Sequence, residues 1–501
     1  MNTMDMLRTL RDQGGKTVTR GLQDDVIQRF AERHPLLRQA VEEAYASWES
    51  LRSEYPNVMG MDEWDQVRAL QQDFVNFYQD DVVNPYVPLA ARGPWIVTLK
   101  GAVVHDNGGY GMLGLGHAPQ HILDAMNAPH VMANIMTASF SQQRFATQLR
   151  KEVGQRRENQ PFEKFLCMNS GSEAVTVACR ISDVNAKLMT DPGGRYAGRT
   201  IKKLALTGGF HGRTDRPAQF SDSSRKTYTQ HLASFRGRDD LITVEPNNPE
   251  AVRQAFEQAE KNNWFFETVF MEPVMGEGNP GMQVTPEFYS VVRELTKKHG
   301  ALLLMDSIQA GLRTTGYLSI TDYPGFENLE GPDMESYSKA LNAGQYPLSV
   351  LAMNATAAGL YRKGIYGNTM TANPRALDVG VAMLESITPQ LRENIVARGH
   401  EFIEKFGRLA DELDGRITRV QGTGLLFSCE LDARYKCYGT GSTEEYLRMQ
   451  GIGVIHGGAN SLRFTPPFDI TSEEVDLIVA ATKDALLNGP NAESEPARAS
   501  A

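Results

Sequence analysis

The chain has 501 residues, of which 22% are charged and 41% hydrophobic, and its formal net charge is −10. These values are ordinary for a globular protein of two or three domains, and they argue against nucleic acid as the default partner because nucleic-acid-binding domains are usually basic. No apolar run approaches the roughly 18 residues of a membrane span.

Residues 1–8 lack the continuous hydrophobic stretch of a signal peptide. The four cysteines have neither the spacing of metal ligands nor the density of a disulfide scaffold: Cys167, Cys179, Cys429 and Cys437. We therefore expect a protein of the reducing cytoplasm that has no metal site and binds neither membrane nor nucleic acid.

The first 90 residues predict a helical extension. Pro35 opens a stripe of apolar residues at three- and four-residue steps, made of Leu37, Val41, Tyr45, Trp48 and Leu51. That spacing is typical of an amphipathic helix, and proline suits a first helical turn. We expect residues 1–90 to pack on the body of the protein or on another subunit. A solvated linker is the alternative, which Trp48, Trp64 and Phe74 disfavour.

The turn Asn169-Ser170-Gly171-Ser172-Glu173-Ala174 opens a predicted helix. The amide groups and the dipole at a helix N-terminus favour a phosphate dianion. The simpler alternative is that Ser170 or Ser172 only caps the helix. The turn by itself is compatible with both interpretations.

A second polar turn, Gly208-Gly209-Phe210-His211-Gly212-Arg213-Thr214, follows the strand-like residues 203–206. Phe210 has the flat ring needed to stack on a pyridine, and Arg213 offers the planar fork that suits a carboxylate. The alternative is a core phenylalanine beside a surface arginine.

Polar residues also follow two later strands. The predicted strand 269–271 leads into Glu272-Pro273-Val274-Met275-Gly276-Glu277-Gly278, and the strand 301–305 leads into Asp306-Ser307-Ile308-Gln309. Between them, Thr285 and Pro286 predict a helix start and Gly300 its end. Alternating strands and helices indicate an α/β fold with a mostly parallel sheet covered on both faces, in which ligands bind at the carboxyl ends of the strands.

Lys339 lies 33 positions after Asp306. Taken alone, it would be interpreted as a solvent-exposed charged side chain. Together with Asp306 it supplies the two groups that pyridoxal phosphate requires. These are an amine that forms a Schiff base and a carboxylate that keeps the pyridine nitrogen protonated. The pair therefore predicts both the cofactor and its chemistry.

Two other motifs do not support a nucleotide site. Gly15-Lys16-Thr17 ends like a phosphate-binding loop, but Leu10 stands where that loop needs glycine. The glycines of residues 111–116 have the wrong spacing for a dinucleotide fingerprint. His117 and His211 have no spaced partners for a metal, so we expect them to make local hydrogen bonds. Near the C-terminus, Thr471 and Glu474 predict a capping box.

Several motifs in this order resemble the class III aminotransferases, which are fold-type I pyridoxal-phosphate enzymes that include ornithine, 4-aminobutyrate and lysine ε-aminotransferases. They are Asn169-Ser170-Gly171-Ser172-Glu173-Ala174, Phe210-His211-Gly212-Arg213-Thr214, Glu272 to Gly278, Asp306-Ser307-Ile308-Gln309, Ser338-Lys339-Ala340-Leu341, Thr369 with Asn373-Pro374, and Arg463-Phe464-Thr465-Pro466-Pro467. The resemblance spans residues 92–488.

The resemblance implies a large cofactor-binding domain with a mostly parallel sheet and a smaller α+β domain, in addition to the helical extension. The expected division is 1–90 for the extension, 91–150 for the N-terminal part of the small domain, 151–375 for the large domain, 376–487 for the C-terminal small domain and 488–501 for a disordered tail.

For the cofactor, the resemblance implies that Lys339 forms the Schiff base and that Asp306 pairs with the ring nitrogen. The remaining cofactor contacts fall to Gln309 on the ring hydroxyl, Phe210 on the ring face, Gly171 and Ser172 on the phosphate, and Glu272 nearby. Thr369 matches a threonine that reaches the phosphate of the neighbouring subunit. A homodimer with active sites at the subunit interface is therefore expected.

For the substrates, Arg213 resembles the arginine that grips the carboxylate of a keto acid. Glu277 and Arg463 resemble a pair in which the glutamate masks the arginine for one substrate and releases it for the other. Tyr110 falls where ornithine enzymes keep a tyrosine that faces the substrate.

Three departures from the family pattern bear on the reaction. Ser307 replaces an acid, Arg313 is displaced by one position, and Met275 replaces a polar residue.

The first hypothesis for the function is an aminotransferase that moves an amino group from an ω-amine or amino acid to a keto acid such as 2-oxoglutarate. The alternative is an enzyme of the same fold that diverts a quinonoid to elimination, side-chain replacement or carbon–carbon bond formation. The third hypothesis is a non-catalytic relative. It is disfavoured because Lys339, Asp306 and Gln309 are retained.

Overall fold

A computed structural model describes residues 1–132 and 135–491, which form two compact units. The first unit contains Met1–Gln120, Arg398–Gln421 and Phe427–Ala501, and the second contains His121–Ala397 and Gly422–Leu426. The five-part division expected from the sequence stays a prediction. Of the predicted disordered tail, residues 492–501 lie outside the described part of the chain.

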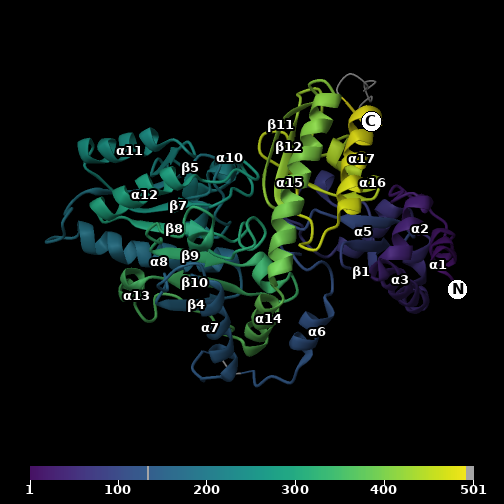
Figure 1. The fold of residues 1–501 in the computed structure, drawn as a ribbon, viewed down its shortest axis with the longest axis horizontal. Helices are drawn as coiled ribbons and strands as arrows, with labels where there is room; N and C mark the ends of the chain where they lie inside the picture. The colour runs from purple at the N-terminus through teal and green to yellow at the C-terminus, as the bar shows by residue number, and fades with distance from the viewer. Residues whose placement is uncertain (133–134, 492–501) are drawn as a thin grey trace. The chain divides into compact units, whose positions relative to one another are not determined.

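The second unit is built on a seven-stranded sheet with the order β4-β10-β9-β8-β7-β5-β6 (Figure 1). The strands are β4 (Lys164–Met168), β5 (Thr200–Leu206), β6 (Leu241–Val244), β7 (Trp264–Met271), β8 (Leu302–Asp306), β9 (Met334–Tyr337) and β10 (Ser349–Met353). The neighbours from β9 to β6 are all parallel, whereas β10 runs antiparallel to both β4 and β9. The mostly parallel sheet predicted from the sequence is confirmed.

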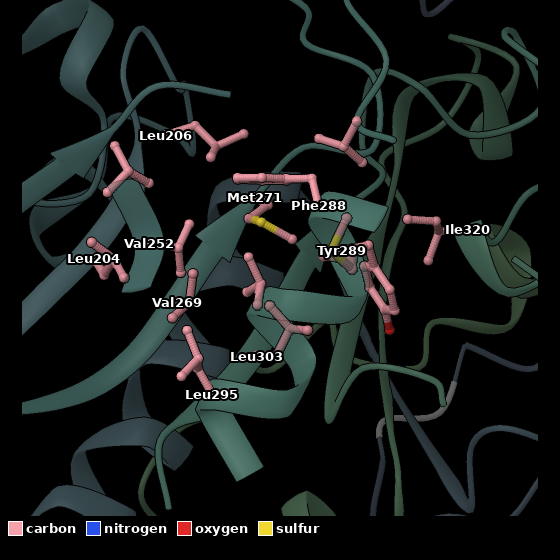
Figure 2. Close-up of a cluster of buried hydrophobic side chains, with 14 of the residues drawn as sticks. Leu204, Leu206, Val252, Val269, Met271, Phe288, Tyr289, Leu295, Leu303 and Ile320 are labelled. Carbon is pink, nitrogen blue, oxygen red and sulfur yellow. The ribbon is translucent and has the colours of Figure 1, made fainter. Parts of the chain in front are cut away.

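The central strands β7 to β10 bury both of their faces, as a sheet covered by helices requires. Successive residues of β8 alternate between two apolar clusters: Leu303 joins one, and Leu302 and Leu304 join the other. The first cluster includes side chains of α11 (Pro249–Lys261) and α12 (Pro286–His299) and is drawn in Figure 2. The second includes side chains of α8 (Gly171–Thr190).

Local signals set the ends of these helices. Thr285 caps α12 by accepting the N–H of Phe288, and Gly300 ends the helix in the left-handed conformation at φ 68°. Ser170 and Glu173 form a reciprocal capping box at the start of α8. The predicted start and end of α12 and the predicted start of α8 are confirmed.

The rest of the second unit is helical or irregular. Its other helices are α6 (Gln120–Asn127), α7 (Phe140–Glu152), α9 (Asp215–Ala218), α10 (Arg225–His231), α13 (Ala355–Leu360) and α14 (Pro374–Glu385). The helix α15 (Pro389–Glu412) begins in the second unit and continues into the first. α8 and α13 lie on one side of the sheet, and α11 and α12 lie on the other (Figure 1).

The first unit begins with the predicted helical extension, made of α1 (Thr3–Arg11), α2 (Asp24–Arg33), α3 (Pro35–Glu54), α4 (Pro56–Met59) and α5 (Glu63–Gln71). α3 starts at Pro35 as predicted, buries Leu37, Val41 and Trp48, and packs against β1 (Pro88–Arg92) and β2 (Trp95–Thr98). Phe74 does not join this core, since it is 79% exposed.

Two four-stranded sheets complete the first unit, with the orders β1-β2-β3-β13 and β11-β12-β15-β14. The further elements are β3 (Val103–Asp106), β11 (Ile417–Thr423), β12 (Leu426–Leu431), α16 (Thr443–Met449), β13 (Ile452–Gly453), β14 (Ile455–Gly457), β15 (Ser461–Phe464) and α17 (Ser472–Asn488). The predicted capping box of Thr471 and Glu474 opens α17. Among the described residues, no helix is long and apolar enough to cross a membrane.

Leu303 tests the cluster in Figure 2, because its side chain is fully buried there. We expect Leu303→Ala to lower the free energy of unfolding by about 2–5 kcal/mol through lost burial and a residual cavity. Chemical denaturation followed by circular dichroism measures this change. Leu188→Ala is the control, since Leu188 is 55% exposed and its truncation should shift the midpoint little.

Candidate active site

The carboxyl ends of three neighbouring parallel strands meet at one edge of the large sheet. Asp306 is the last residue of β8, Glu272 follows β7 directly, and Lys339 comes two residues after β9. The structure thus brings together residues that the sequence placed at successive strand ends. This is the edge at which α/β sheets bind their ligands.

The carboxylate of Asp306 is buried and held by polar neighbours. Nδ1 of His211 lies 2.9 Å from Oδ2, and Oδ1 accepts hydrogen bonds from the Ser336 hydroxyl at 3.0 Å and the Ile308 amide at 3.3 Å. Asp306 is only 4% exposed, so its charge depends on these contacts. His211 makes a hydrogen bond as expected, but its side-chain partner is not local. The sequence did not reveal its partner, because 95 positions separate the two residues.

Lys339 opens a short 3-10 helix, η5 (Lys339–Asn342), in an unusual backbone conformation. Its φ is +48°, in the left-handed region that residues with a Cβ rarely adopt. Such conformations cost free energy and cluster at functional sites. The conformation of Lys339 therefore adds a structural reason to regard it as functional.

The N-terminus of α8 lies against the turn that contains Gly212. A Cβ on Gly212 would come within 2.4 Å of the Ser172 Oγ, so only glycine permits this approach. The Ser172 Oγ also accepts the amide of Arg213 at 3.4 Å. Ser170 is the helix cap, as the simpler interpretation held, and the helix end remains a favourable place for an anion.

Glu272 ties two loops of the site together. Its Oε1 accepts the amide of Phe210 at 3.0 Å, and its Oε2 accepts the amide of Gly276 at 2.8 Å. Burial raises the pKa of Glu272 to about 7. His211 opposes this rise, whereas the charge of Asp306 adds to it. Glu272 is thus a buried carboxyl group that holds the backbone of these two loops in position.

Gln309 lies in the same part of the unit. A Cβ on Gly276 would fall 1.6 Å from the Gln309 Oε1, so a side chain at position 276 would displace Gln309. Gln309 itself is 7% exposed. Because position 276 is a glycine, the side-chain amide of Gln309 can lie against the loop that begins at Glu272.

Arg213 lies between an aromatic ring and a carboxylate. Its guanidinium carbon is 5.2 Å from the ring centre of Phe210, and its Nη2 is 4.0 Å from the Glu277 Oε1. The Arg213 side chain is 44% exposed, which leaves it accessible to a small anion. Thr369 is exposed as well.

Two further candidates, Tyr110 and Arg463, belong to the first unit. Arg463 is buried on β15, and its guanidinium carbon is 5.4 Å from the ring centre of Tyr110. The ring of Tyr78 stacks on Tyr110 at 5.9 Å, and a cavity of about 530 Å³ borders both rings. Tyr110 has a φ of +52°, another left-handed conformation. Sequence reasoning missed Tyr78, and the pairing of Glu277 with Arg463 stays a prediction.

The chain matches known proteins over most of its length. The profile of the aminotransferase class-III family matches residues 77–486. An acetylornithine aminotransferase of Neisseria meningitidis is 28% identical over 394 residues, covering 78% of this chain and 92% of that protein. An ornithine aminotransferase 2 of Staphylococcus aureus is 28% identical over 401 residues, with 78% and 92% covered.

The ornithine aminotransferase from Toxoplasma gondii ME49 has the same fold, with a TM-score of 0.72 at 21% identity over 87% of this chain and 98% of that one. The chain belongs to the class III aminotransferase family. It is a pyridoxal-phosphate-dependent transferase of fold type I, and its class of reaction is amino-group transfer.

The residues at this edge of the sheet fit pyridoxal phosphate chemically. The buried Asp306 suits a protonated ring nitrogen, Lys339 provides an amine, and the α8 N-terminus suits a phosphate. Within the described residues, no group of three or more His, Cys, Asp or Glu side chains is arranged to hold a metal ion.

The raised pKa of Glu272 predicts a pH effect on stability. Between about pH 4.5 and pH 7, folded Glu272 keeps a proton that the unfolded chain releases, so its contribution makes stability fall as pH rises. We expect the free energy of unfolding of Glu272→Gln to fall by about 1–3 kcal/mol less than that of the wild type over this pH range. Denaturation midpoints at several pH values measure the slope. Glu287→Gln, at an exposed site, should keep the wild-type slope; an unchanged slope in Glu272→Gln would contradict the assignment.

Proposed function

We propose that this protein transfers an amino group from an ω-amine or amino acid to a keto acid such as 2-oxoglutarate. The observation that carries the proposal is the buried Asp306 carboxylate, held by His211 and Ser336 at the sheet edge that also carries Lys339. A buried carboxylate held in this way suits pairing with the protonated nitrogen of a pyridine ring better than binding a ligand that stays in solvent.

When bound, pyridoxal phosphate supplies an aldehyde and an electron-withdrawing ring. The Lys339 Nζ would hold the cofactor covalently and, as an unprotonated amine, would move a proton to and from the substrate carbon. Asp306 keeps the proton on the ring nitrogen, and its contacts with His211 and Ser336 fix the direction of its carboxylate.

The local geometry supports the remaining cofactor contacts of this proposal. Gly171 and Ser172 hold the phosphate at the start of α8, where the helix dipole favours negative charge. Phe210 stacks on the ring, and its position depends on the hydrogen bond from its amide to Glu272. Gln309 binds the ring hydroxyl.

The substrate carboxylate binds to Arg213. The Arg213 side chain is 44% exposed, and its planar guanidinium has the geometry to engage an incoming carboxylate with two parallel hydrogen bonds. Arg463 and Tyr110 contact the donor substrate, and Glu277 masks Arg463 for one of the two substrates. The stacked ring of Tyr78 supports Tyr110 in this role.

We also propose that the protein is a homodimer of the cytoplasm with active sites at the subunit interface. Large apolar side chains are exposed on one segment of the second unit, namely Val131, Met132, Ile135, Met136 and Phe140. Exposed apolar groups of this extent mark association surfaces. The exposed Thr369 would then reach the phosphate of the partner subunit. The buried free thiols, such as Cys179, suit a reducing compartment.

Lys339→Ala tests the assignment of the amine. The variant should fold and still bind pyridoxal phosphate through the α8 N-terminus, because those contacts are unchanged. It should lose the absorbance of the covalently held cofactor, and turnover should fall by about three orders of magnitude or more. The measurements are the absorbance spectrum and a panel of amines with and without 2-oxoglutarate. Lys298→Ala, at an exposed helix position, is the control; wild-type turnover in Lys339→Ala would refute the site.

Arg213→Lys separates the two substrates. An ammonium cannot reproduce the bidentate hydrogen bonds of a guanidinium, so affinity for the keto acid should fall by roughly one to two orders of magnitude. The amine half-reaction, measured alone in single turnovers, should change less. If both half-reactions decline equally, Arg213 does not select the keto acid.

A further inference from the structure

Two adjacent strands are linked by a reciprocal pair of side-chain hydrogen bonds. β8 ends in Asp306 and is followed by Ser307, and β9 carries Glu335 followed by Ser336. The Ser336 hydroxyl donates to the Asp306 carboxylate at 3.0 Å, and the Ser307 hydroxyl donates to the Glu335 carboxylate at 2.5 Å. Each strand therefore contributes one carboxylate and one hydroxyl, and each hydroxyl bonds to the carboxylate of the other strand.

The two links lie on opposite faces of the sheet. Asp306 is in register with Ser336, and Met334 belongs to the cluster beneath α8. Because side chains alternate along a strand, Ser336 shares the face of Met334, and Glu335 points to the opposite face. Glu335 thus lies outside the set of groups that can touch the cofactor, although it is bonded to the residue that follows Asp306.

Glu335 is completely buried and fully satisfied by neutral donors. In addition to Ser307, it accepts the Ser319 hydroxyl at 2.5 Å, the Ile320 amide at 2.9 Å and the Tyr337 hydroxyl at 2.9 Å. A buried carboxylate with a complete set of donors is rigid, because losing any one donor leaves a polar atom unpaired in a medium of low dielectric constant.

The peptide that joins Asp306 to Ser307 is held on both sides. The amide of Ser307 donates to the carbonyl of Ser336 at 3.0 Å, and its hydroxyl is fixed by Glu335. The backbone of Asp306 therefore has little freedom to rotate. Ser307 stands where the family usually has an acid, so the carboxylate on this face is supplied from the neighbouring strand.

We infer that Glu335 is a positioning residue for Asp306, acting through Ser307 to hold the Asp306 carboxylate at the ring nitrogen of the cofactor. The inference rests on the proposed function, since it assigns Asp306 to the ring nitrogen. Glu335 touches neither cofactor nor substrate in this proposal. Its contribution is to fix the carboxyl end of β8 against β9, the strand that leads into Lys339.

The test compares two serines that give Glu335 equivalent hydrogen bonds. Ser307→Ala removes the donor that is linked to Asp306, and Ser319→Ala removes a donor at the same 2.5 Å distance that is not. Both variants lose one bond to the same carboxylate, and Ser319→Ala also loses the hydroxyl that accepts the Thr321 amide at 3.2 Å. A role in stability alone therefore predicts an effect of Ser319→Ala at least as large as that of Ser307→Ala. Ser307→Thr restores the hydroxyl and is the rescue variant.

The main readout is the ¹⁵N chemical shift of pyridoxal phosphate labelled at its ring nitrogen, which reports whether that nitrogen is protonated. Spectra are recorded at about pH 8, above the wild-type pKa of Glu335, which burial raises to about 7. Single-turnover rates with one amine and dissociation constants for the cofactor are measured on the same proteins.

We expect Ser307→Ala to move the ring signal toward the unprotonated form and to slow the single turnover roughly tenfold, the effect of one lost hydrogen bond to a charged group. Ser319→Ala and Ser307→Thr should stay within about twofold of wild type. Equal effects in the two alanine variants, or no shift in Ser307→Ala, overturn the inference. If Ser307→Ala does not fold, Ser307→Cys, which weakens the donor and keeps the volume, takes its place. A wild type that neither binds the cofactor nor reacts with any amine would instead refute the proposed function.

Discussion

The site depends on keeping one negative charge buried at the end of β8. A carboxylate removed from water is costly unless it is hydrogen-bonded, and Asp306 is 4% exposed. His211 and Ser336 meet this requirement on the face that α8 covers. The same contacts orient the carboxylate, so the interactions that stabilise the fold here also set the direction of the group that we propose pairs with the cofactor ring.

The departures from the family pattern find places in the structure. Met275 is completely buried and packs in the apolar cluster of α11 and α12, so it contributes to the core. Arg313 is buried as well and donates to the carbonyl of Leu425 at 3.3 Å, and desolvation lowers its pKa to about 9. Ser307 bonds to Glu335. Each of these side chains thus serves internal packing or hydrogen bonding, and Asp306 and Lys339 still stand at the strand ends.

The first unit adds features that reach beyond the family motifs. The segment after α5 carries Tyr78, whose ring stacks on Tyr110, and Tyr110 also lies near the guanidinium of Arg463. The left-handed backbone of Tyr110 parallels that of Lys339. Two of the residues chosen from sequence thus share a costly conformation, which is retained only where the surrounding structure enforces it.

The sequence by itself determined the parallel sheet, the start of α3 at Pro35 and the ends of α12, and it predicted Asp306 and Lys339 as the cofactor pair. These rest on local signals such as periodicity, capping residues and polar groups at strand ends, which act over a few positions. Only the tertiary structure decided that His211 is the neighbour of Asp306 and that Glu335 bonds to Ser307. Such partners are distant along the chain, and their pairing depends on strand register and on which face a side chain takes, neither of which spacing reveals.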